Sequence, residues 1–140
     1  MNNEYTDLGP SNNLARYVKR SQVTPDGRPA HDAFRLREKE DYLSTFCLEM
    51  LLGNTIDAQV QDLRQTCPLT RKPRDQFALL NVGVTKQAVE QESPDRRVLE
   101  FKHVPMHGLE SHCGIFGVRV DDEIIQKIIA EEVFNMVAAT

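Results

Sequence analysis

The clearest hydrophobic pattern in the chain lies near its C-terminal end. Isoleucine and valine recur there at the three- and four-residue spacing of an amphipathic helix. Asp121 is placed to cap this helix, and the acidic residues after it suit the positive N-terminal end. The pattern therefore predicts a long C-terminal helix whose apolar stripe comprises Ile124, Ile125, Ile128, Ile129, Val133 and Val137.

Three segments of the second half have the pattern of β-strands. Residues 77–84 are apolar on both alternating sets, which suits a strand covered on both faces. Residues 97–104 alternate between apolar and polar, and residues 113–120 form another short run rich in β-forming residues. These segments predict a three-stranded antiparallel meander, or a larger sheet that contains it.

The first half carries weaker signals. Residues 1–13 are polar and rich in turn-forming residues, which predicts a loose N-terminal arm. Residues 14–23 fit a short helix or a strand, whereas the proline and glycine within residues 24–29 predict a turn. Residues 42–46 read as a strand that leads into a helical stretch over 48–52.

A further helix is expected to begin at Asn54 or Thr55, either of which can cap it. Its inward face comprises Ile56, Val60 and Leu63. The predicted fold class is therefore α+β, with an antiparallel sheet of three or more strands packed against two or more helices. Because 140 residues is the usual size of one domain, residues 14–140 are expected to form a single domain.

Composition and charge exclude several classes of protein. With 40% hydrophobic and 27% charged residues, the chain is expected to fold independently. It contains no apolar run long enough for a membrane span and begins without a secretory signal, so we expect a cytoplasmic protein. The three widely spaced cysteines predict free thiols rather than a disulfide framework; they are Cys47, Cys67 and Cys113.

The reactive side chains gather in one stretch, which contains His103, His107, His112 and Cys113. An extended strand would separate His103 from His107 by about 13 Å, too far for both to bind one metal ion. Their spacing matches none of the common zinc patterns. We therefore expect neither a metal nor another cofactor.

Hairpin geometry gives the same residues a second interpretation. If residues 105–111 form the loop, His103 lies opposite Cys113 with the Cβ atoms about 5 Å apart. A histidine at that distance can take the proton of a thiol, so His103, His112 and Cys113 are the candidate catalytic residues of a small hydrolase or transferase. The alternative, favoured by the ordinary behaviour of free cysteine, is a core-facing stripe that His103 and Cys113 share with Leu99, Phe101 and Ile115.

A local excess of positive charge suggests a binding surface. Residues 16–39 contain seven basic and three acidic side chains, although the whole chain has a net charge of −4. Tyr17 and Phe34 are interleaved with the arginines, which is a mixture used on single-stranded RNA, so RNA binding is an alternative function. The candidate binding residues are Arg16, Lys19, Arg20, Arg35 and Arg37.

The order of several short motifs resembles that of small bacterial proteins of unassigned function. The motifs are Arg16-Tyr17, Ala33-Phe34, Leu43-Ser44 and Ser111-His112-Cys113-Gly114-Ile115, followed by an acidic helix start. The resemblance implies that Ser111-His112 has a role, and that the protein is an accessory component, such as one of a toxin–antitoxin or phage-defence assembly.

The leading expectation is a non-enzymatic interaction module. Phe134 and Met136 fall outside the main stripe of the C-terminal helix. With them, the helix has more apolar surface than one sheet is expected to cover. Binding of a partner protein or self-association is therefore expected through this helix, assisted by residues 16–39 or by the acidic residues around 121–132. No membrane partner is expected.

Overall fold

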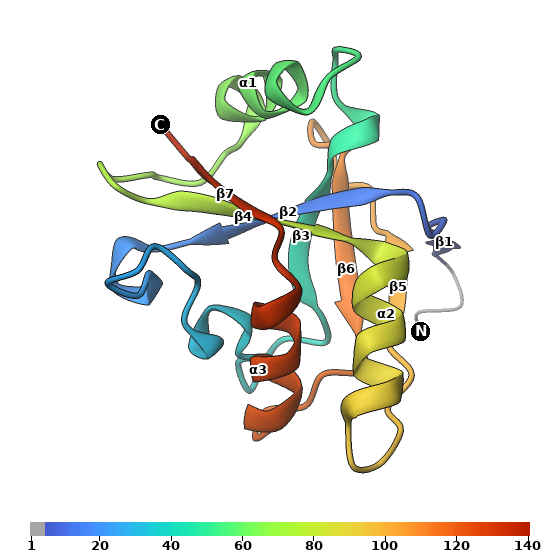
Figure 1. The fold of residues 1–140 in the computed structure, drawn as a ribbon. Helices are drawn as coiled ribbons and strands as arrows, with labels where there is room; N and C mark the ends of the chain where they lie inside the picture. Colours follow the sequence, from blue (N-terminus) through green and yellow to red (C-terminus); the bar gives the residue numbers. More distant parts are fainter. Residues whose placement is uncertain (1–4) are drawn as a thin grey trace.

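The computed structural model describes residues 5–140 and has an α+β fold (Figure 1). A seven-stranded antiparallel sheet has the order β1-β5-β6-β3-β2-β4-β7. Its strands are β1 (Thr6–Asp7), β2 (Asn13–Val18), β3 (Leu43–Cys47), β4 (Gln76–Asn81), β5 (Glu100–His103), β6 (His112–Phe116) and β7 (Asn135–Ala138). The α-helices of the described residues are α1 (Ile56–Thr66), α2 (Val82–Glu92) and α3 (Glu123–Glu132), and none of them is long and apolar enough to cross a membrane.

Two hydrophobic cores lie on opposite faces of the sheet. Leu14 and Val18 of β2 point into the larger core with the buried residues of α2 and α3, whereas Ala15 points into a smaller core beneath α1. Figure 1 shows the same arrangement, with α1 on one side of the sheet and α2 and α3 on the other. The alternating direction of strand side chains produces these two cores.

Several local predictions are confirmed. The Thr55 hydroxyl accepts a hydrogen bond from the Ala58 amide at 3.1 Å and caps α1. Residues 24–29 form the predicted turn, in which Gly27 has a φ of 83°. The β5–β6 hairpin has the predicted register, with His103 opposite Cys113 and Phe101 opposite Ile115.

The three-stranded meander is only part of the sheet. β5 and β6 are neighbours, but β3 and β2 lie between β6 and β4, so the sheet is larger than the meander. The strand expected over residues 77–84 ends at Asn81, because its side-chain oxygen accepts from the Val84 amide at 2.9 Å and starts α2.

The prediction of a long C-terminal helix is wrong. α3 has 10 residues and ends at Glu132, and the next residues form β7 against β4. Arg28 ends the helix by donating to the carbonyl oxygens of Val133 at 2.8 Å and Ala130 at 2.9 Å. The valines that continue the helical stripe are equally suited to a strand, so the pattern did not reveal the change.

Side chains bond part of the free edge of β7. The Ala139 amide donates to the Asp75 carbonyl oxygen of the neighbouring chain segment. Because backbone groups alternate in direction along a strand, those of Ala138 and Met136 point away from β4. The Met136 amide donates to Asn135 Oδ1 at 3.0 Å, and Arg64 Nε donates to the Ala138 carbonyl oxygen at 2.9 Å. Two outward backbone groups of this edge strand therefore have partners within the chain.

The predicted N-terminal arm falls partly outside the described residues, since residues 1–4 are not among them. Beyond that, Thr6 and Asp7 pair with β5. Glu49 accepts from the Asn13 amide at 2.7 Å and from Asn12 Nδ2 at 3.3 Å, which joins the start of β2 to the end of β3.

Candidate functional site

His112 is buried in the sheet, where both of its ring nitrogens have partners. Nδ1 lies 2.8 Å from the Val104 carbonyl oxygen and Nε2 lies 3.3 Å from the Ser44 hydroxyl. A carbonyl oxygen can only accept, so Nδ1 carries the proton and Nε2 accepts from Ser44. Burial lowers the pKa of His112 and keeps the ring neutral.

The Ser44–His112 pair has the contact of a nucleophile with a base, but it lies within the sheet. Ser44 is half-buried in β3, an interior strand, and the His112 ring lies 5.8 Å from the Tyr42 ring and 6.2 Å from the Phe46 ring, measured between centroids. Neither of the two cavities described below is lined by Ser44 or His112. The arrangement gives both ring nitrogens of a buried histidine a hydrogen-bond partner.

Cys113 and His103 face each other across the hairpin but make separate contacts. Cys113 is fully buried, and its thiol lies 3.4 Å from the Ser111 carbonyl oxygen. A contact with the Cys47 thiol, together with burial, raises the pKa of Cys113 and favours the protonated thiol. His103 Nε2 instead lies 2.6 Å from the Glu110 carbonyl oxygen.

Of the candidate catalytic residues, His112 and Cys113 are buried, His103 is half-buried, and each makes a hydrogen bond to a backbone carbonyl oxygen. Among residues 5–140, no three His, Cys, Asp or Glu side chains converge closely enough to hold a metal ion. His103 and Cys113 are neighbours, but His112 points to the opposite face of the sheet toward Ser44. The three side chains do not form one cluster.

The predicted basic segment divides into buried and exposed residues. Arg16 is partly buried and donates to the carbonyl oxygens of Ala33 at 3.0 Å and Ser44 at 2.9 Å, and burial lowers its pKa to about 10. Phe34 is fully buried. The remaining predicted binding residues are exposed, namely Lys19, Arg20, Arg35 and Arg37.

Asp75 connects the end of β2 to the loop before β4. Its carboxylate accepts from the Arg20 amide at 2.9 Å, from the Lys72 amide at 2.8 Å and from the Tyr17 hydroxyl. Burial opposes ionisation of Asp75, but these donors hold its pKa below the ordinary value. Basic residues that are more than 50 positions apart in sequence are thereby brought to one end of the sheet.

Two arginines beside this junction line an open cavity of about 560 Å³. Arg64 comes from α1 and Arg71 from the loop after it, and both are half-buried. Arg64 Nη1 donates to Gln61 Oε1 at 2.9 Å, and Arg71 Nη1 donates to the Ala139 carbonyl oxygen at 2.8 Å. The other lining residues carry no charged side chain; they are Gln61, Gln65, Leu69 and Thr140.

We call this surface the basic end, defined as Lys19, Arg20, Arg64, Arg71, Lys72 and Arg74. Among residues 5–140, none of its side chains forms an ion pair. A second cavity, along α2, is lined by both Lys86 and Glu90, so it has no comparable excess of one charge.

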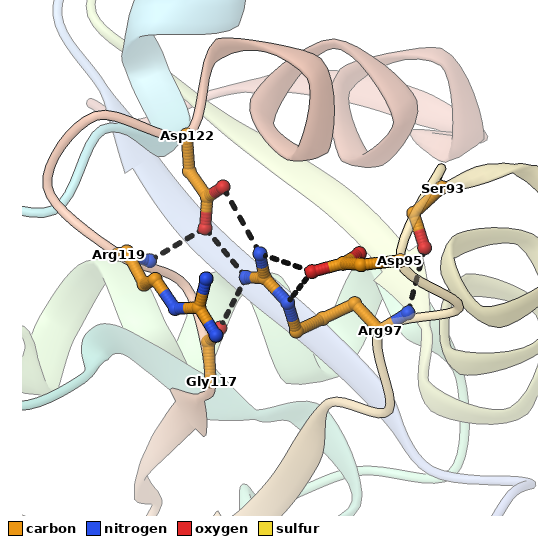
Figure 2. Close-up of polar contacts among 6 residues, drawn as sticks. All are labelled: Ser93, Asp95, Arg97, Gly117, Arg119 and Asp122. Atoms are coloured by element: carbon orange, nitrogen blue, oxygen red, sulfur yellow. Dashed lines mark hydrogen bonds and ion pairs between the residues drawn. The ribbon is translucent and has the colours of Figure 1, made fainter.

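Figure 2 shows a contrasting arginine whose donors are fully occupied. Arg97 Nη1 lies 2.6 Å from Asp122 and 2.7 Å from the Gly117 carbonyl oxygen, and Nη2 lies 2.8 Å from Asp95. Asp122 also accepts from the Arg119 amide at 2.7 Å. This network fastens the loop before β5 to the start of α3 and leaves no donor of the Arg97 guanidinium group for a ligand.

Four residues of the basic end were not predicted, namely Arg64, Arg71, Lys72 and Arg74, and neither was Asp75. The basic composition of residues 67–75 was visible, but it indicated only a surface connection. Arg64 is the one basic residue of α1, and the other sequence signals of this helix are its apolar spacing and its cap. What groups these residues is Asp75 and the β4–β7 pairing, neither of which has a local sequence signal.

The chain matches no protein-family model, no curated protein and no solved structure.

Proposed function

We propose that the protein is an interaction module that binds an acidic segment of a partner protein at its basic end. The observation that carries this proposal is the pair of half-buried guanidinium groups of Arg64 and Arg71, which line one cavity and have no carboxylate partner. Charges held in this way are complementary to an anionic partner.

The surroundings favour a protein over a nucleic acid. Leu69, which is 43% exposed, adds an apolar contact to the cavity, and Gln61 and Gln65 add amide groups. Tyr17 is half-buried, and its hydroxyl is bonded to Asp75, so its ring is not a free stacking surface. The net charge of −4 also disfavours non-specific binding to a polyphosphate backbone.

The surface proposed from the sequence is replaced by this one. The apolar stripe of α3 is buried against the sheet through Ile125, Ile128 and Ile129. Phe134, 49% exposed, follows the helix rather than belonging to it, and Met136 packs against the larger core. Of the predicted stripe within α3, Ile124 alone remains well exposed, at 55%.

Fluorescence anisotropy with a labelled peptide of alternating glutamate and glycine tests the proposal. We expect binding that weakens with salt and that is lost in the variant Arg20→Gln/Lys72→Gln/Arg74→Gln. The matched control is Arg35→Gln/Arg37→Gln/Lys39→Gln, which removes the same charge from exposed positions outside the basic end. It should retain binding to within about twofold.

Equal losses in the two variants would show that net charge alone governs the interaction, and the proposal would fail. A single-stranded RNA of equal length serves as competitor. Displacement of the peptide by RNA at much lower concentration than by unlabelled peptide would instead favour the RNA-binding alternative.

A further inference from the structure

Arg64 and Arg71 are positioned by bonds that leave part of each guanidinium group unused. Arg64 donates through Nε and Nη1, and Arg71 through Nη1. Among the residues that the structure describes, Arg64 Nη2 and the Nε and Nη2 atoms of Arg71 donate no hydrogen bond. Since a guanidinium group has five N–H donors, several remain available at the cavity.

The charge and number of these donors exceed what one carboxylate can use. Two guanidinium groups present two positive charges, whereas a carboxylate supplies one negative charge and two oxygens. A phosphorylated side chain carries a charge of about −1.5 to −2 at neutral pH and three acceptor oxygens. The neutral amides of Gln61 and Gln65, which also line the cavity, add further donors.

We propose that the Arg64–Arg71 cavity binds the phosphoryl group of a phosphorylated serine or threonine. This inference rests on the proposed function, because it places the phosphorylated residue within the acidic segment of the partner. The exposed members of the basic end attract that segment, and the cavity selects its phosphorylated form. The carbonyl bonds of Arg64 and Arg71 reduce the side-chain entropy lost on binding.

Three labelled peptides that share glutamate-containing flanks and differ at one central residue test the proposal. The centre is serine, glutamate or phosphoserine, and anisotropy is measured at one ionic strength. We expect the phosphoserine peptide to bind about tenfold more tightly than the glutamate peptide. Arg71→Lys keeps the charge but loses the planar donors, so it should remove most of this gain, whereas Arg35→Lys should not.

A second variant guards against misfolding of the first. Leu69→Glu places a carboxylate in the cavity at a side chain that is already 43% exposed, so the fold should tolerate it. It should abolish the preference for phosphoserine by repulsion. Folding of each variant is checked by circular dichroism.

The outcomes separate the two proposals. Binding of the glutamate and phosphoserine peptides with equal affinity would overturn the phosphoryl site and leave the interaction module standing. A phosphoserine preference that survives in both Arg71→Lys and Leu69→Glu would also overturn the cavity assignment. If none of the three peptides binds, the proposed function itself fails.

Discussion

At the scale of single residues, His112 has a hydrogen-bond partner at each of its ring nitrogens. Its two nitrogens are satisfied by Val104 and Ser44, and its burial keeps it neutral. The sequence marks it as chemically capable because histidine is rare and lies near a cysteine. Only the three-dimensional contacts reveal that both nitrogens are already occupied.

The lowered pKa of His112 predicts a loss of stability in mild acid. In the unfolded chain this histidine takes up a proton near pH 6.5, whereas the folded state resists protonation until lower pH. The unfolded state therefore binds more protons, and stability falls as the pH drops from 7 toward 5. This residue contributes at most about 1.4 kcal/mol per pH unit.

Denaturant titrations at pH 7.5, 6.5 and 5.5 measure this effect. His112→Asn keeps a donor for Val104 but does not titrate, so its stability should change less over the same range. An identical pH dependence in the variant and the parent protein would contradict the role assigned to His112.

Asp75 carries a second prediction at this scale. Asp75→Ala leaves the Arg20 amide, the Lys72 amide and the Tyr17 hydroxyl without their acceptor. We expect a loss of about 3 kcal/mol in the free energy of unfolding, because two part-buried amides lose a charged acceptor and the Tyr17 hydroxyl keeps only the Thr70 carbonyl oxygen at 3.5 Å. Tyr17→Phe removes only one of the three donors and should cost about 1 kcal/mol. Similar losses of stability in both variants would argue against the role of Asp75 in joining β2 to the loop before β4.

At the scale of elements, local signals predicted more than non-local ones. The α1 cap and the register of the β5–β6 hairpin depend on residues close in sequence, and both predictions are confirmed. The insertion of β3 and β2 between β6 and β4 depends on long-range pairing, which alternation alone does not specify. The end of α3 depends on Arg28, which lies 105 positions before Val133.

The Arg97 network joins two loops. It predicts that removing a buried ion pair costs more stability than removing an exposed one. The Arg97 and Asp122 side chains are only 11% and 12% exposed. Arg97→Met should therefore cost about 3 kcal/mol, because it leaves a carboxylate poorly solvated. Lys127→Met removes the exposed pair with Glu123 on α3 and should cost less than about 0.5 kcal/mol. Thermal and urea unfolding of both variants provide the comparison.

At the scale of the whole molecule, charge is unevenly paired. The ion pairs of the described residues involve Asp7, His31 and residues 95–127, whereas the basic end has none. Composition predicted a basic region in the first half but not its extent. The chain brings Lys19 and Arg20 beside Lys72 and Arg74 through the pairing of β2 with β4, in which Val18 lies opposite Gln76, and through Asp75. The full surface was therefore not predictable from a window of sequence.

Within the described part of the chain, the like charges of the basic end have no ion-pair partners, so they repel one another. Removing them should therefore increase stability while it weakens binding. Arg20→Gln/Lys72→Gln/Arg74→Gln should raise the free energy of unfolding by about 0.5 kcal/mol at low salt while it abolishes peptide binding. The gain should shrink at high salt because the repulsion is screened. Unfolding titrations at two salt concentrations measure it, and a loss of stability in this variant would show that these side chains support the fold.

The bonded part of the β7 edge has a consequence for solubility. An uncovered edge strand is a template onto which another chain can add its own strand, and repetition of that step leads to aggregation. Here Asn135 and Arg64 bond two of the outward groups, the Met136 amide and the Ala138 carbonyl oxygen. Because Arg64 also lines the cavity, replacing it would expose the Ala138 carbonyl and promote intermolecular sheet growth. The residue that we propose for ligand binding should thus also limit the addition of a second chain to this edge.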